Sequence, residues 1–148
     1  MIAVIQRVSR ASVTVDGNIE GSIENGLLIL LGVKNGDTER DAVLLADKIA
    51  KLRIFSDENG KMNLSCMDIG GSALVISNFT LLANYKKGNR PDYMNGAKPD
   101  VANALYEYFC AHLGKSLPTY KGIFGADMKV ELLNDGPVTI VMDSEVLK

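Results

Sequence analysis

The hydrophobic pattern predicts strands along the first third of the chain. Residues 3–8 are apolar and β-branched, and residues 11–15 alternate between apolar and polar before Asp16-Gly17. Asp-Gly between two alternating runs is a strong hairpin signal, so residues 18–23 are expected to return as a strand. Residues 26–33 form a continuous apolar run, which predicts a central strand buried on both faces.

Two later segments show helical spacing. Asp37 or Thr38 caps a first helix that runs to about Leu52, with apolar residues recurring at Ala42, Leu45, Ala46, Ile49 and Leu52. A second helix begins near Pro99, because proline is favoured in the first turn, and runs to about Leu113. Its predicted buried stripe consists of Val101, Leu105, Tyr108 and Phe109.

The remaining strands are short. Two of them, residues 52–55 and 62–64, flank the turn at 57–60, and residues 72–77 form a buried strand. A long polar segment covers residues 78–98. Two final strands are expected at 128–133 and 138–142, joined by residues 134–137.

Strands outnumber helices, and no repeat, linker or low-complexity segment divides the chain. We therefore expect one domain over residues 1–148 with an α+β fold, a curved, barrel-like β-sheet sandwich with two outer helices. The longest apolar run, residues 27–31, is too short to span a bilayer, and the first residues lack the pattern of a signal peptide. We expect no membrane association and a cytoplasmic location.

Composition limits the class of function. The net charge of −2 argues against a protein that coats nucleic acid by bulk charge, although residues 86–91 form a short basic patch between Tyr85 and Tyr93 that could contact phosphate. Cys66 and Cys110 are far apart in the sequence, which is typical of reduced thiols. A single disulfide between them is the alternative. No cluster of histidines and cysteines indicates a metal, and no glycine-rich phosphate loop indicates a nucleotide cofactor.

Conventional nucleophilic catalysis has little support. The one histidine, His112, lies two residues from Cys110, and residues at that spacing do not share a helix face. The simpler interpretation is a histidine at a helix end, interacting with the helix dipole.

Two segments can carry chemistry. Residues 77–80, Ser77-Asn78-Phe79-Thr80, leave a strand for a loop, where backbone N–H groups free of the ladder can form an oxyanion hole; the alternative is hydroxyls bonded to their own backbone. Gly136-Pro137 fits either a hairpin turn or a cis peptide that presents a rigid surface without side chains.

Several blocks in order along the whole chain resemble the D-aminoacyl-tRNA deacylase family. They are the opening Met-Ile-Ala-Val-Ile-Gln-Arg-Val, residues 53–57 with 60–63, the stretch 77–81 with 87–91, and residues 134–139. The family usually has glutamine where this chain has Asn78, which shortens the side chain by one methylene and affects rate or specificity only if that side chain touches substrate.

The resemblance implies a homodimer with an active site at each subunit interface. Gly136-Pro137, expected to be cis, would enter the partner's site opposite residues 77–80. Phe124 and Met128 match positions that line the pocket for the terminal adenosine of tRNA, and Arg7 matches a residue that braces the Gly-Pro loop. No metal or cofactor is implied.

The implied activity is hydrolysis of the ester that joins a D-amino acid to the 3′ end of tRNA, as translation quality control. Glycyl-tRNA mischarged on tRNA-Ala is expected to be a substrate as well, and L-aminoacyl-tRNA is expected to be rejected by the Gly-cis-Pro peptide. Two alternatives stay open: an RNA-binding module without chemistry, and a hydrolase that uses Cys110 or Thr80 as its nucleophile.

Overall fold

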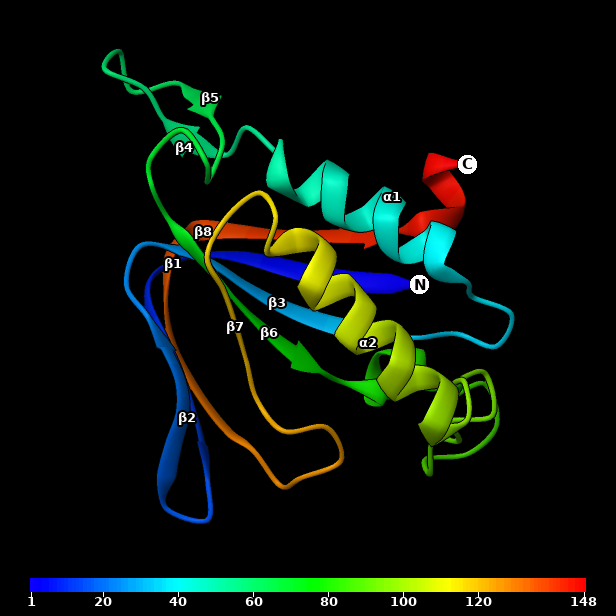
Figure 1. The fold of residues 1–148 in the computed structure, drawn as a ribbon. Coiled ribbons are helices and arrows are strands. Elements are labelled where there is room, and N and C mark those ends of the chain that lie inside the picture. Colours follow the sequence, from blue (N-terminus) through cyan, green and yellow to red (C-terminus); the bar gives the residue numbers. More distant parts are fainter.

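The computed structural model describes residues 1–148 and consists of a strongly curved sheet with two helices on one side (Figure 1). The strands are β1 (Ile2–Val15), β2 (Asn18–Ile23), β3 (Gly26–Gly32), β4 (Phe55–Ser56), β5 (Met62–Leu64), β6 (Ser72–Ser77), β7 (Thr119–Lys121) and β8 (Lys129–Asp143). The helices are α1 (Glu39–Ala50) and α2 (Pro99–Leu113), with short 3₁₀ helices η1 (Phe79–Leu82) and η2 (Ser144–Leu147).

The long strand β1 organises the main sheet. Along one edge it pairs antiparallel with β3 over its first half and with β2 over its second half, and along the other edge it pairs antiparallel with β8. Strands β3, β6 and β7 are parallel to one another. The sheet is mixed and curls into a nearly closed, barrel-like form, which confirms the predicted α+β fold.

The larger part of the core lies between the sheet and the helices. Alternate side chains of each strand point to opposite faces. In β3, therefore, Leu27, Ile29 and Leu31 pack toward α1 and α2, while Leu28 packs inside the curl against Leu74 of β6. All five side chains are at most 1% exposed, so the prediction that residues 26–33 form a strand buried on both faces is confirmed.

Helix α2 has the predicted bounds but a different buried stripe. Val101 and Tyr108 are 45% and 38% exposed in this chain, whereas Tyr106 and Phe109 are buried, so the predicted stripe is wrong at two positions. Positions 102, 106, 109 and 113 satisfy helical spacing equally well. The Tyr106 hydroxyl donates a hydrogen bond to the Val75 carbonyl of β6 at 2.8 Å, which fixes the rotation of the helix.

The predictions of two strands at 3–8 and 11–15, and of two more at 128–133 and 138–142, were wrong in the same way. Each pair is one continuous strand, because β1 and β8 pair with each other on both sides of the irregular region opposite Arg7. Residues 134–137 therefore do not reverse the chain as a hairpin would. Helix α1 ends at Ala50 rather than Leu52, β4 is shorter than residues 52–55, and β7 and η1 had not been predicted.

No helix of the structure combines the length and the apolar character that crossing a membrane would need.

Candidate active site

The end of strand β6 is held close to β3. Ser77 is the last residue in register with β3, opposite Leu31, and the Asn78 N–H then donates to the Leu31 carbonyl at 2.8 Å. Gly32 makes this approach possible, because a Cβ at that position would lie 3.2 Å from the Asn78 carbonyl oxygen. The chain then turns into η1, so Phe79 and Thr80 leave the ladder directly beside the core.

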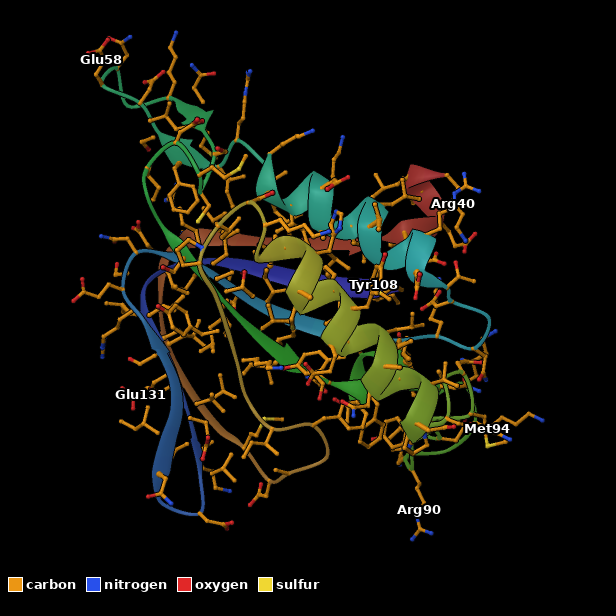
Figure 2. All side chains as sticks on the ribbon, viewed as in Figure 1. Arg40, Glu58, Arg90, Met94, Tyr108 and Glu131 are labelled. Atoms are coloured by element: carbon orange, nitrogen blue, oxygen red, sulfur yellow. The ribbon has the colours of Figure 1, made fainter.

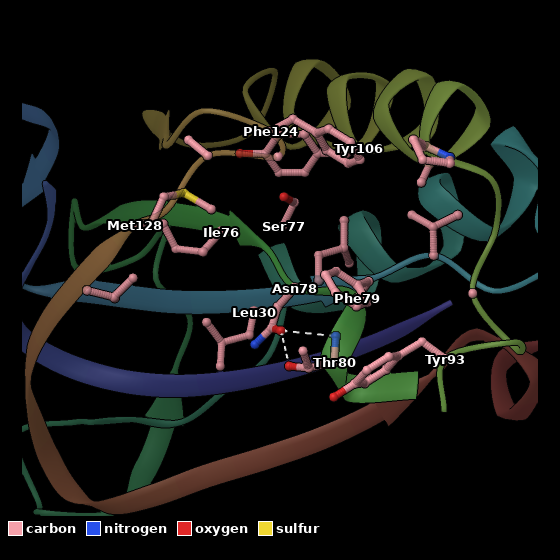
Figure 3. A pocket seen from close by; sticks show the side chains of 18 of the residues that line it. Leu30, Ile76, Ser77, Asn78, Phe79, Thr80, Tyr93, Tyr106, Phe124 and Met128 are labelled. Atoms are coloured by element: carbon pink, nitrogen blue, oxygen red, sulfur yellow. Dashed lines mark hydrogen bonds between the residues drawn. The ribbon is translucent and has the colours of Figure 1, made fainter. Parts of the chain in front are cut away.

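Asn78 ties this turn together. Its side-chain oxygen accepts hydrogen bonds from the Thr80 N–H at 3.2 Å and from the Thr80 hydroxyl (Figure 3). The Thr80 amide and hydroxyl are therefore both engaged by Asn78. The Phe79 N–H, as the first amide of η1, has no partner within that helix.

A cavity of about 800 Å³ opens over this strand end. Such a volume is typical of a site for a small molecule or for the end of a larger one. Fifteen of its 23 lining residues are hydrophobic, and the only charged one is Asp127. The residues of the turn, Ser77, Asn78, Phe79 and Thr80, form one side, and side chains from α2 and residues 124–128 form another (Figure 3).

The parallel pairing of β6 with β7 brings the far wall into place. Val75 lies opposite Lys121, so the chain that follows β7 runs past the end of β6. There Phe124 packs against Tyr106 with ring centroids 6.1 Å apart, and Met128 also faces the cavity. Gly122 leaves room for this methionine, because a Cβ there would lie 2.5 Å from the Met128 sulfur.

Tyr93 joins the polar segment to the mouth of the cavity. Its ring meets that of Phe79 edge to face, with centroids 4.9 Å apart and an interplanar angle of 81°. Phe79 is 62% exposed, so the contact with Tyr93 fixes the orientation of a ring that is otherwise surrounded by solvent.

Gly136 and Pro137 form a bulge in β8. The register with β1 places Asn134 opposite Val8 and Thr139 opposite Gln6, so four residues of β8 face the single residue Arg7. The Gly136-Pro137 peptide is cis, as expected, and both residues are exposed. Neither residue lines the cavity of its own chain.

Two side chains hold the bulge. The Arg7 guanidinium donates to the Asp135 carbonyl and to the Ile54 carbonyl, each at 2.7 Å, and so links the bulge to the segment before β4. Asn134 closes the base of the bulge by donating to the Arg7 carbonyl at 3.0 Å and to the Val138 carbonyl at 2.9 Å. The bulge is therefore a fixed projection of the sheet.

Of the alternative catalytic residues, Thr80 lines the cavity, whereas Cys110 and His112 do not. Cys66 and Cys110 are both free and buried, so the disulfide left open by the sequence is not formed. Burial raises the pKa of the Cys66 thiol to about 11 and that of the Cys110 thiol to about 12. His112 instead contacts Asp47 of α1 at 2.8 Å.

The carboxylates of Asp37, Asp41 and Glu145 lie close enough together to suggest a metal site. Cations of the chain already occupy them: the Met1 ammonium contacts Asp37 at 2.8 Å, and Lys148 contacts Asp41 at 3.0 Å and Glu145 at 2.7 Å. The cluster is accounted for as an internal ion-pair network.

The cavity unites six of the nine residues singled out from the sequence: Ser77, Asn78, Phe79, Thr80, Phe124 and Met128. Arg7, Gly136 and Pro137 form a separate group at the bulge. Sequence reasoning missed Tyr93 as a neighbour of Phe79, and it missed Tyr106 of the cavity wall. The spacing of Tyr106 to Phe109 and Leu113 was the signal that could have revealed the latter.

Comparison with known proteins gives consistent matches over the chain. The profile of a family described as D-Tyr-tRNA(Tyr) deacylase matches residues 4–143. A protein named D-aminoacyl-tRNA deacylase from a Sulfurihydrogenibium species is 57% identical over 99% of this chain and 100% of its own length. A protein of the same name from Parabacteroides distasonis is 54% identical over 98% of both chains.

Two solved structures share the fold. The structure titled c-Myc DNA Unwinding Element Binding Protein has a TM-score of 0.91 and 41% identity, covering 97% of this chain and 98% of its own. A probable eukaryotic D-amino acid tRNA deacylase has a TM-score of 0.80 over 96% of this chain and 98% of its own. Its identity of 15% makes it a likeness of fold alone.

Proposed function

This chain belongs to the D-Tyr-tRNA(Tyr) deacylase family, and we propose that it acts as a D-aminoacyl-tRNA deacylase, a hydrolase of the ester between a D-amino acid and the 3′ end of tRNA. The observation that carries the proposal at the level of the site is the cavity of about 800 Å³ whose wall contains the end of β6. It combines an apolar chamber with backbone amides at one edge.

The terminal adenosine occupies the apolar part of this cavity in our proposal. Phe124 and Met128 offer flat and polarisable surfaces for the base, and Tyr106 supports Phe124 from α2. The ester then lies at the end of β6, beside residues 77–80. Because the nucleoside is bound in the cavity, the acyl group is held in place without a pocket for any particular amino-acid side chain.

The Phe79 N–H is the proposed donor to the ester carbonyl. An amide held in place by the fold stabilises the oxyanion of the tetrahedral intermediate without reorganisation. Thr80 takes a supporting part, because Asn78 already accepts hydrogen bonds from both its amide and its hydroxyl. Asn78 acts here by stabilising the turn. This role does not require contact with substrate, so asparagine can take the place of the glutamine that is usual in the family.

Water is the proposed nucleophile. A threonine hydroxyl attacks only after a base removes its proton. The Thr80 proton points instead to an amide oxygen, which is a very weak base. An aminoacyl ester is already activated, and the vicinal hydroxyl of the terminal ribose lies next to it, where it can orient the attacking water.

Chirality is selected by the bulge of a second chain. Gly136 and Pro137 are exposed, fixed by Arg7 and Asn134, and absent from their own cavity. In the proposed homodimer the bulge of each chain enters the partner's cavity, where main-chain carbonyls bind the α-ammonium group. An L side chain would collide with the proline and its backbone, whereas a D side chain points away and glycine has none.

An apolar row on the sheet face opposite the helices supports this assembly. Val4 of β1 lies between Val141 of β8 and Leu30 of β3, so three apolar residues cross the sheet in one line. Val141 is 70% exposed and Leu30 lines the cavity. Exposed apolar rows of this kind mark protein contacts, and a two-fold interface here would bring the partner to the cavity.

Incubation of the purified protein with D-tyrosyl-tRNA tests the proposal. We expect free D-tyrosine and intact tRNA as products, and a far slower reaction when the terminal ribose lacks the vicinal hydroxyl. Failure to release D-tyrosine, with tRNA still bound, would favour an RNA-binding module instead.

A further inference from the structure

One loop of the chain carries positive charge that no contact within the protein neutralises. Lys86, Lys87 and Arg90 are exposed, and none of them takes part in an ion pair. Six other basic residues, at positions 7, 10, 34, 121, 129 and 148, have acidic partners, whereas Arg40, Lys48 and Lys51 also lack one but are spread along α1 rather than gathered on one loop. Because the net charge of the whole protein is −2, this local concentration of positive charge is distinct from the average surface.

The loop is held closed at its base by hydrogen bonds between Asn84 and Asp92, a pair that we call the clamp. The Asn84 N–H donates to the Asp92 carbonyl at 2.8 Å, and the Asp92 N–H donates to the Asn84 carbonyl at 3.0 Å. Their side chains add a hydrogen bond at 3.2 Å. Gly88, with a φ of 69°, lets the chain turn between the basic residues. The three cations are therefore presented on a closed loop, residues 85–91.

The clamp connects directly to the cavity. Tyr93 follows Asp92, lines the cavity and meets Phe79 edge to face. Arg90 is three residues from Tyr93, so its backbone lies within roughly 11 Å of that residue. Figure 2 shows the Arg90 side chain extending outward into open space. A chain that leaves the mouth of the cavity would pass this loop.

Tyr85 adds a second kind of contact on the same loop. It is 78% exposed. An exposed aromatic ring among basic residues is the combination that binds single-stranded nucleic acid, since bases stack on the ring while cations contact phosphates.

We propose that the closed loop 85–91 binds the phosphate backbone of the single-stranded 3′ end of tRNA, with Lys86, Lys87 and Arg90 contacting the phosphates that precede the terminal nucleoside. The inference rests on the proposed function, which puts that nucleoside in the cavity. The contacts are to phosphates, so the loop adds affinity for any tRNA without selecting its sequence.

The test compares a loop variant, K86Q/K87Q/R90Q, with a matched control, R40Q/K48Q/K51Q, which removes three exposed cations at α1. Arg40 lies well away from Arg90 (Figure 2). Binding of an acceptor-arm RNA that has a single-stranded 3′ end and carries no amino acid is measured by fluorescence anisotropy across a range of salt concentrations. Hydrolysis is measured in parallel on D-tyrosyl-tRNA and on the D-tyrosyl ester of adenosine alone.

Each surface ion contact is worth roughly threefold in affinity, so three lost contacts weaken RNA binding roughly 30-fold. The slope of log Kd against log salt falls by about 2, because each single-strand phosphate contact contributes about 0.7. The control variant stays within about threefold of the parent. On hydrolysis, the loop variant shows a KM increase for D-tyrosyl-tRNA that is much larger than any change on the adenosine ester.

An unchanged salt slope, equal weakening by the control, or an equal loss on both esters would overturn the proposal. The proposed function can fail separately. If the parent hydrolyses neither ester yet binds the RNA with a loop-dependent salt slope, the loop assignment stands and the deacylase assignment does not.

Discussion

Replacing Arg7 with alanine tests whether the bulge at Gly136 and Pro137 acts as a fixed selector. Arg7 joins the bulge to the segment before β4, through the carbonyls of Asp135 and Ile54 at 2.7 Å each. The Arg7 side chain is only 12% exposed; its hydrogen bond to Ile54 is partly buried, and its hydrogen bond to Asp135 lies at the surface. The Arg7→Ala variant removes both contacts and leaves two carbonyls to be solvated by water.

The expected loss of stability follows from those contacts. A hydrogen bond to a charged group contributes about 1.5–3 kcal/mol. The Asp135 residue is exposed and its carbonyl can bind water instead, so the two bonds together are worth about 2–3 kcal/mol rather than the full sum. The ion pair with the Asp135 carboxylate, at 3.5 Å and with that group 55% exposed, adds little.

Two measurements check this prediction, urea unfolding and the ratio of deacylation rates on D- and L-tyrosyl-tRNA. We expect the free energy of unfolding to fall by about 2–3 kcal/mol and the D/L ratio to fall tenfold or more, because a loosened bulge tolerates an L side chain. Arg10→Ala is the control: Arg10 is 58% exposed and pairs with Glu131 at 3.6 Å, so less than about 1 kcal/mol is lost. A lower stability with an unchanged D/L ratio would refute the selector role.

Three further predictions follow from the structure. Thr80→Ala keeps its deacylation rate within about tenfold of the parent, whereas loss of a covalent nucleophile would cost ~10⁴-fold or more. Burial opposes ionisation of Asp41, but hydrogen bonds, above all from Ser144, hold the pKa of Asp41 below its usual value; its carboxylate therefore stabilises the fold above pH ~4, and the stability gap to Asp41→Asn shrinks as the pH is lowered. A gap independent of pH in urea unfolding would contradict this. Val141→Asp shifts the protein from dimer to monomer in sedimentation and lowers activity, while Val146→Asp, on an 82% exposed residue of η2, leaves the dimer intact.

Local signals in the sequence were sufficient for elements that are defined by their own residues. The alternating pattern around Asp16-Gly17, the apolar run of β6 and the first-turn Pro99 each predicted the bounds of an element that the structure contains. In these cases the turn or cap that ends the element lies next to it in the chain.

Elements that depend on distant partners were not predictable in this way. A proline donates no ladder hydrogen bond, so Pro137 suggested the end of a strand. The pairing of β8 with β1 resumes at Thr139, and the continuity of β8 is set by a strand more than 100 residues away. The three residues of β7 carry no distinctive pattern, and they are a strand only because they pair with β6.

The candidate site shows the same division. Residues 77–80 were predicted as site residues from their position at a strand end. Phe124 and Met128 were predicted only from the family resemblance. Their meeting in one cavity depends on the pairing of β6 with β7, which no local pattern reveals. The hydrogen bonds from Thr80 to Asn78 were also unforeseen, although asparagine followed two residues later by threonine is a favourable spacing for such a turn.

The central claim is that one site hydrolyses aminoacyl-tRNA and rejects L-amino acids by backbone sterics. Single-turnover rates on D-tyrosyl-, glycyl- and L-tyrosyl-tRNA test it most directly. The account predicts rapid hydrolysis of the D-tyrosyl and glycyl esters, and almost none of the L-tyrosyl ester, because only the last presents a side chain to the proline. Comparable rates on D- and L-tyrosyl-tRNA would contradict it.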